Sequence, residues 1–179
     1  MTSLVFLDES AAQTTLSRLY GRAPRGQRLV EAVPAGPWRT RTLVAAVRCD
    51  GVLAPLLLDG SMNGATFAGY VRRVLVPELR PGDVVVWDNL AAHKVVGARE
   101  AIEAAGARVL LLPPYSPDFN PIEHVWAKVK AWLRKAAART WAALLDAVAD
   151  ALRAVTESDC QGCFAHGGYH PATQKEKVL

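Results

Sequence analysis

The stretch Val84-Val85-Val86-Trp87-Asp88 is an apolar run that ends in a carboxylate, and Leu4-Val5-Phe6-Leu7-Asp8 repeats the pattern near the amino end of the chain. A third acid, Glu123, follows Leu110-Leu111-Leu112-Pro113-Pro114 after a turn-rich segment. Short apolar runs of this kind predict buried strands. A carboxylate at the end of a buried strand is partly desolvated, which is costly unless a cation or hydrogen-bond donors compensate it. Three such acids indicate a shared cation, and ligation by oxygen alone suits Mg²⁺ or Mn²⁺.

Turn residues divide the rest of the chain into further elements. Cys49-Asp50-Gly51 lies between two apolar, β-branched runs, and an Asp-Gly pair in this position predicts a β-hairpin. The expected strands are 4–8, 42–48, 52–58, 84–88 and 108–112, and the expected helices are 65–79, 95–105, 121–138 and 141–156. Short connections predict antiparallel neighbours, and intervening helices predict parallel ones. We expect an α/β fold with a mixed five-stranded sheet, three antiparallel strands and then two parallel ones, flanked by helices.

This topology would bring the three acids together. If the first strand is central and the fourth lies beside it in parallel, Asp8 and Asp88 emerge at the same carboxyl edge, where α/β sheets bind their ligands. Glu123 falls in the first turn of the helix that leaves the fifth strand. Carboxylates within a few ångströms of one another raise each other's pKa, and a divalent cation removes that repulsion.

Composition describes a globular protein. The chain has 179 residues, 51% of them hydrophobic and 21% charged, and we expect one domain over 1–179 with a core of about 1–156 and a tail at 157–179. No apolar run has the length of a membrane span, and no cationic leader is present, so we expect a soluble cytoplasmic protein without a membrane partner. Three cysteines are too few for a disulfide framework.

Positive charge is concentrated in two segments. Between residues 18 and 48 there are seven arginines and one acid, and between 124 and 145 there are five cations and no acid. Such segregation indicates a polyanionic partner, most commonly nucleic acid, although a solvated basic face explains it equally well. The candidate DNA-binding residues are Arg22, Arg25 and Arg28 in the first segment and Lys130 and Arg134 in the second.

Three motifs carry a resemblance to a known family. They are Leu4-Val5-Phe6-Leu7-Asp8-Glu9-Ser10, Val86-Trp87-Asp88-Asn89-Leu90-Ala91-Ala92-His93-Lys94 and Leu112-Pro113-Pro114-Tyr115-Ser116-Pro117-Asp118-Phe119-Asn120-Pro121-Ile122-Glu123. Together they resemble the DDE-type catalytic domain of mariner-like bacterial insertion-sequence transposases. The 34 residues between the second and third acids (89–122) match the spacing usual for that group.

The resemblance implies a ribonuclease-H-like fold and DNA strand cleavage and transfer. Asp8, Asp88 and Glu123 would be the catalytic residues and would hold two Mg²⁺ or Mn²⁺ ions, with Asn89 orienting Asp88 and Lys94 contacting a phosphate. The partner would be double-stranded DNA, as element ends and target, and the chain would be nucleoid-associated when bound to it. Such transposases also carry a helix-turn-helix half. We expect it to be absent from this chain, and we therefore expect a homodimer, a separately encoded DNA-recognition half, or both.

Alternative interpretations remain for several residues. The chain could be a related nuclease without strand transfer, or a catalytically inactive transposase fragment that binds DNA or a partner transposase and regulates it. Asp88-Asn89 could form an Asx-turn, and Glu123 could complete a capping box with Asn120. The cluster Cys160, Cys163, His166 and His170 has ligand-type residues, but its pairs are too close for a zinc-finger loop, and we expect no zinc there.

Overall fold

The computed structural model describes residues 3–30, 32, 34, 41–88, 97–114 and 116–169. Its strands are β1 (Leu4–Ala11), β2 (Thr42–Arg48), β3 (Gly51–Leu58), β4 (Val84–Trp87) and β5 (Arg108–Leu111). Its α-helices are α1 (Gly64–Tyr70), α2 (Ala98–Ala104), α3 (Pro121–Ala136), α4 (Trp141–Arg153) and α5 (Glu157–His166). A π-helical turn, η1 (Val71–Leu75), and a 3₁₀ turn, η2 (Val76–Glu78), continue α1, so one helical segment covers nearly the whole expected range 65–79.

The five strands form one mixed sheet in the order β3-β2-β1-β4-β5. β1 pairs with β2 and β2 with β3 in antiparallel fashion, whereas β4 lies parallel to both β1 and β5. Arg48 stands opposite Gly51 in the β2–β3 pairing, which is the hairpin that the Asp-Gly pair predicts. The predicted topology, with β1 in the centre, is therefore confirmed.

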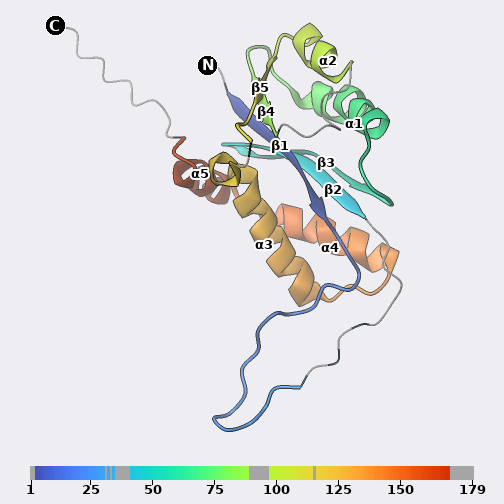
Figure 1. The fold of residues 1–179 in the computed structure, drawn as a ribbon, viewed down its shortest axis with the longest axis vertical. Coiled ribbons are helices and arrows are strands. Elements are labelled where there is room, and N and C mark those ends of the chain that lie inside the picture. Colours follow the sequence, from blue (N-terminus) through green and yellow to red (C-terminus); the bar gives the residue numbers. More distant parts are fainter. Residues whose placement is uncertain are drawn as a thin grey trace, which may run out of the picture.

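Helices cover both faces of the sheet (Figure 1). On one face α3, α4 and α5 pack on a core that includes Phe6, Val86 and Trp126. On the other face α1, η1 and α2 enclose a second core that includes Val5, Val85 and Phe67. Because successive residues of a strand point to opposite faces, the neighbours Val5 and Phe6 belong to different cores. Figure 1 accordingly shows three layers with the sheet in the middle.

Two expectations about individual elements were wrong. β1 continues past Asp8 to Ala11, because residues 8–11 pair with β2 after the pairing with β4 has ended. β5 was expected to be buried, but it is the edge strand of the sheet as described, and Leu110 and Leu111 are exposed there. The tail contains a helix, α5, whose first turn is capped by Thr156 and Asp159 in a reciprocal capping box.

A buried ion pair fixes the start of β4. Arg48, at the end of β2, places Nη2 2.6 Å from Oδ2 of Asp83, the residue before β4, and both side chains are almost fully buried. The same Asp83 oxygen accepts a hydrogen bond from the backbone N–H of Arg80. Charged groups are retained in a core only when they are paired in this way. The ion pair therefore links the end of β2 to the start of β4, the two strands on either side of β1.

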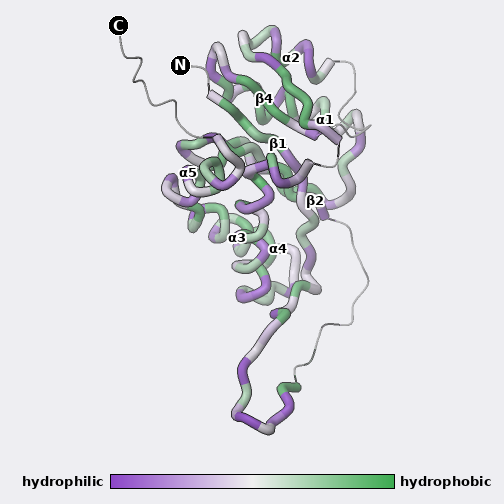
Figure 2. The backbone as a smooth tube through the Cα atoms, turned by 60° about the vertical axis from the view of Figure 1, so that its left-hand side comes forward, coloured by the Kyte–Doolittle hydropathy of each residue, from purple (hydrophilic) through white to green (hydrophobic). Residues whose placement is uncertain are grey.

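The connection between β1 and β2 extends away from the sheet, beyond the ends of α3 and α4 (Figure 1). Its base is fixed, since Arg139 Nη1 donates to the backbone oxygens of Thr14 and Leu16, each at 2.9 Å. Every residue from 18 to 30 is exposed. Figure 2 shows that this arm, which we define as residues 18–30, is largely hydrophilic. Within the described ranges, no helix has the length and apolarity needed to cross a bilayer.

Candidate metal centre and nucleic-acid interface

The pairing register of β1 and β4 aligns the first two acids. Leu4 stands opposite Val84 and Phe6 opposite Val86, and the same offset, continued by two residues, relates Asp8 to Asp88. Side chains two residues apart on a strand point to the same face, so Asp8 lies on the face of Phe6, which α3 covers, and Asp88 follows the neighbouring strand at the corresponding end. Asp88 directly follows β4, as expected, whereas Asp8 lies inside β1.

Helix α3 brings Glu123 to this face. The helix begins with Pro121 at its first position, a favourable site because proline lacks the N–H that would be unpaired there. Glu123 is exposed in the first turn, and its backbone N–H bonds the Asn120 carbonyl oxygen at 3.1 Å. The Asn120 side chain makes no capping hydrogen bond, and its Oδ1 is buried without a partner within the described part of the chain. The reciprocal capping box is therefore not formed, which leaves the Glu123 carboxylate available for another role.

Asp8 is the acid of this group whose pKa is perturbed by the others. Burial raises the pKa of its carboxyl from 3.8 to about 7. A backbone hydrogen bond from Glu9 opposes this shift, whereas the negative charges of Glu123, Glu9 and Asp88 add to the rise in pKa. The charges of Glu123 and Asp88 therefore act on the carboxyl of Asp8. A bound cation would relieve this repulsion.

The donor chemistry fits a hard divalent cation. Carboxylate oxygens are the ligands that Mg²⁺ and Mn²⁺ prefer, and these ions keep several waters while binding one or two carboxylates directly. Among residues 3–88, 97–114 and 116–169, apart from the undescribed positions at 31, 33 and 35–40, no group of three or more His, Cys, Asp or Glu side chains is arranged so that it could hold a metal ion. The carboxylates of Asp8, Asp88 and Glu123 thus have the oxygen ligands that such an ion prefers, but in this structure they are not arranged as a complete coordination shell.

Two aromatic residues support this site. Trp126 donates a hydrogen bond from Nε1 to Oδ2 of Asp8 at 3.2 Å. Tyr169 donates from its hydroxyl to the Phe119 carbonyl oxygen at 2.8 Å, and its ring lies 4.9 Å from that of Phe6, between centroids. Phe6 also makes an edge-to-face contact with Phe164 of α5, at 5.4 Å. The segment after α4 therefore supports both β1 and the turn that leads into Glu123.

The expected DNA-binding residues have different positions. Arg22, Arg25 and Arg28 are exposed on the arm, and within the described residues none of them forms an ion pair. Lys130 and Arg134 are half-buried on α3, beyond Glu123. Asn89 and Lys94 lie outside the described residues.

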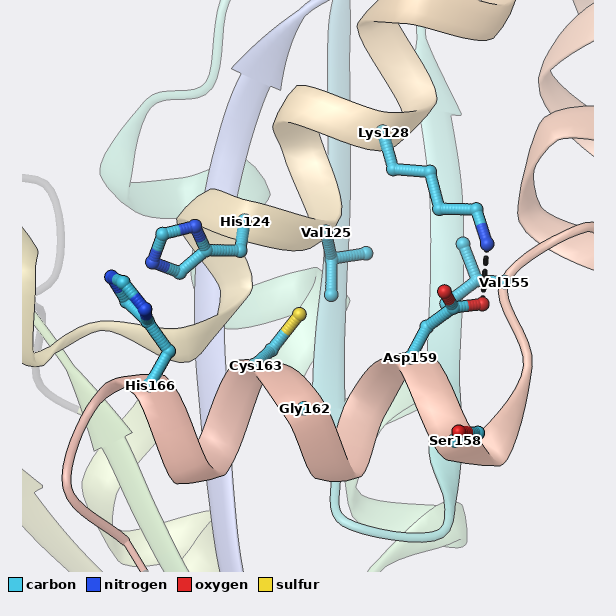
Figure 3. Close-up of a pocket in the computed structure, with 9 residues that line it drawn as sticks. All are labelled: His124, Val125, Lys128, Val155, Ser158, Asp159, Gly162, Cys163 and His166. Atoms are coloured by element: carbon cyan, nitrogen blue, oxygen red, sulfur yellow. Dashed lines mark hydrogen bonds and ion pairs between the residues drawn. The ribbon is translucent and has the colours of Figure 1, made fainter.

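The Cys/His cluster of the sequence does not form one group of side chains, because its members on α5 lie in different environments. Cys160 is fully buried, and burial raises the pKa of its thiol to about 11, whereas Cys163 and His166 line a surface cavity of about 420 Å³ between α3 and α5. His124 and His166 meet edge to face in this cavity with centroids 4.3 Å apart, and Lys128 pairs with Asp159 (Figure 3). His170 lies outside the described residues.

Comparison with known proteins places this site in a family. A family model described as DDE superfamily endonuclease matches residues 3–144, a range that contains Asp8, Asp88 and Glu123. The chain belongs to the DDE superfamily endonuclease family. None of the curated protein sequences compared with this family member matches it.

Solved structures of a mariner transposase share the fold of this DDE endonuclease domain. The pre-cleavage Mos1 transpososome matches with a TM-score of 0.74 and 16% identity, covering 93% of this chain and 53% of that chain. The mariner Mos1 paired end complex with Mg matches with a TM-score of 0.74 and 20% identity, covering 91% and 51%. The catalytic domain of Mos1 mariner transposase matches with a TM-score of 0.64 and 16% identity, covering 93% and 78%. At this identity the likeness shows the ribonuclease-H-like fold, and the DDE domain spans about half the length of the first of these chains.

The exposed arm provides a test of nucleic-acid binding by this DDE domain. Changing Arg22, Arg25 and Arg28 together to Glu should weaken binding to non-specific duplex DNA, because each cation that contacts a phosphate releases condensed counterions. The slope of log affinity against log salt should fall by roughly 2–3, since each lost contact accounts for about 0.9. Fluorescence anisotropy across a salt series measures it.

The matched control is Arg73→Glu. Arg73 is an exposed arginine on η1, which covers the sheet face opposite to α3. It should leave the salt slope nearly unchanged. An affinity that is insensitive to salt, or equal losses in both variants, would assign the arm arginines to an ordinary solvated face.

Proposed function

We propose that this chain is the catalytic domain of a DNA transposase of the mariner-like insertion-sequence type, which cleaves DNA strands and transfers their ends with a divalent cation. Asp8 and Asp88 are the principal ligands, and Glu123 completes the site from α3. The ion is Mg²⁺ or Mn²⁺, two of them in the fully loaded site. The observation that carries the proposal is the parallel pairing of β1 with β4, which brings Asp8 and Asp88 to the same end of two neighbouring strands, beside the helix of Glu123.

The bound ion would supply Lewis-acid activation of the attacking oxygen and stabilisation of the leaving oxygen at the phosphorus. The chain contributes the rest. β1 and β4 hold two carboxylates at one position in a rigid sheet, which is the preorganisation that in-line displacement requires. The exposed arginines of the arm and the cations of α3 provide contacts for the backbone of duplex DNA. The titles of the related structures describe Mos1 complexes with transposon ends and with Mn or Mg, which supports both the substrate and the cofactor.

The decisive experiment measures nicking of supercoiled plasmid by the purified chain in Mg²⁺, in Mn²⁺ and in EDTA. We expect nicking only with a divalent cation. In Asp88→Asn the nicking rate should fall by roughly 10³-fold or more, since a metal site stabilises the transition state by several kcal/mol. Calorimetry should show Mn²⁺ binding to the wild type that weakens strongly in Asp88→Asn. Unchanged Mn²⁺ binding in both Asp8→Asn and Asp88→Asn would remove these residues from the site.

Joining of labelled 3′ ends to a second DNA separates the remaining alternatives. Nicking with joining supports a transposase, and nicking without joining supports a nuclease. DNA binding without either activity supports the regulatory fragment.

A further inference from the structure

A polar contact connects the helix of Glu123 to the strand of Asp8. Trp126 lies three residues after Glu123 on α3, and its Nε1 lies 3.2 Å from Oδ2 of Asp8. Its side chain is 1% exposed within the core that also contains Phe6 and Ile122. The bond joins residues that are 118 positions apart in the sequence.

The chemistry of the two groups makes this contact directional. An indole N–H is a donor only, and a carboxylate is an acceptor with two oxygens. The indole therefore holds Oδ2 of Asp8, and the Glu9 backbone N–H also bonds this carboxyl. Two carboxylate oxygens have about four lone-pair sites, so the group can accept both bonds and still bind a cation. Because the ring is packed on all sides, it cannot follow the carboxylate if Asp8 rotates, so the bond selects one orientation of that side chain.

We propose that Trp126 is a positioning residue for the cation site: it holds Asp8 in the orientation that receives Mg²⁺ or Mn²⁺ and ties that ligand to the helix that carries Glu123. This inference rests on the proposed function, because it presupposes that Asp8 binds the ion. Metal-binding side chains in proteins are commonly oriented by such partners, and loss of a partner typically weakens metal binding by about 10–100-fold.

The test compares two tryptophans of the same helix. Trp126→Phe keeps an aromatic ring in the core and removes the donor. Trp132→Phe makes the same chemical change at a partly exposed ring, 40% accessible, on α3. Calorimetric titration with Mn²⁺ at pH 8 should show binding about 10-fold weaker in Trp126→Phe and unchanged binding in Trp132→Phe. Thermal unfolding in EDTA verifies that both variants are folded.

A second measurement uses the wild-type chain and so does not depend on the stability of a variant. With ¹⁵N-labelled tryptophan, the indole N–H resonance of Trp126 should shift when Mg²⁺ is added, because the charge on its acceptor is neutralised. The resonances of Trp132 and Trp141 should stay in place, and the Trp132→Phe and Trp141→Phe variants identify them.

The outcomes separate this inference from the proposed function. A wild type that binds no Mn²⁺ would overturn the proposed function. Binding in the wild type with equal affinity in Trp126→Phe, or a Trp126 resonance that stays fixed while Mn²⁺ binds, would overturn the positioning role alone and reduce Trp126 to a core residue.

Discussion

Glu123→Gln should nearly abolish metal-dependent DNA nicking and leave the unfolding temperature almost unchanged. The neutral amide cannot supply the anionic oxygen that a hard cation needs, and the loss should be roughly 10³-fold or more. Stability should change by no more than about 0.5 kcal/mol, since Glu123 is exposed and the Asn120 side chain forms no capping bond with this helix. The measurement is paired: plasmid nicking in Mn²⁺ and thermal unfolding, on the same preparation.

Asp118→Asn is the matched control. Asp118 is an exposed acid in the 3₁₀ turn η4 (Pro117–Phe119), just before α3, and it should be dispensable for cutting. If Glu123→Gln cuts normally and Asp118→Asn does not, the third ligand is Asp118. If Glu123→Gln unfolds several degrees earlier, Glu123 has a structural role that the geometry of the helix start does not reveal.

Asp8→Asn should stabilise the metal-free protein at pH 8 while it removes Mn²⁺ binding. In the folded chain the pKa of Asp8 is raised to about 7, against 3.8 ordinarily, so the folded state holds a proton that the unfolded state has already lost between these values. Stability therefore falls as pH rises from about 4 to about 7 and stays low above that. The difference between the two pKa values corresponds to about 4 kcal/mol, which the neutral amide would recover. The amide oxygen can still accept from Trp126.

Urea unfolding of the wild type and of Asp8→Asn in EDTA at pH 4, 6 and 8 measures this effect. The two stabilities should diverge with increasing pH, and Mn²⁺ should then stabilise only the wild type. Asp146→Asn, a change at an exposed carboxylate of α4, serves as the control and should follow the wild type at every pH. Parallel pH profiles for wild type and Asp8→Asn would show that burial does not perturb this carboxyl.

The sheet could be predicted because its signals are local. The Asp50-Gly51 turn between apolar runs indicates the β2–β3 hairpin, and the helix between β3 and β4 requires the later strands to run parallel. Placing β1 in the centre then sets Asp8 near Asp88 before any coordinates are known. The end of β1 could not be found in this way. Asp8-Glu9-Ser10 is polar, and only its pairing with the buried strand β2 keeps it extended.

Other features depended on contacts between distant elements. The bond from Trp126 to Asp8 is set by how α3 crosses the sheet, and the helical period of the sequence places Trp126 only on an apolar face. The exposure of Leu110 and Leu111 follows from the edge position of β5, which apolar composition alone does not reveal. Helix α5 had a local signal that was missed: Thr156 followed three residues later by Asp159 is a capping pattern.

The family model matches residues 3–144, whereas the contacts that support the acids continue to Tyr169. Phe164 and Tyr169 pack on Phe6, two positions before the first acid, and the Tyr169 hydroxyl holds the Phe119 carbonyl, four positions before the third. The range that the family model matches is thus shorter than the part of the chain that supports the acids. A protein that borrows this catalytic sheet would also need α5 and Tyr169. A piece ending at residue 144 would keep the three acids but lose the contacts of Phe164 and Tyr169 with Phe6 and of Tyr169 with the Phe119 carbonyl.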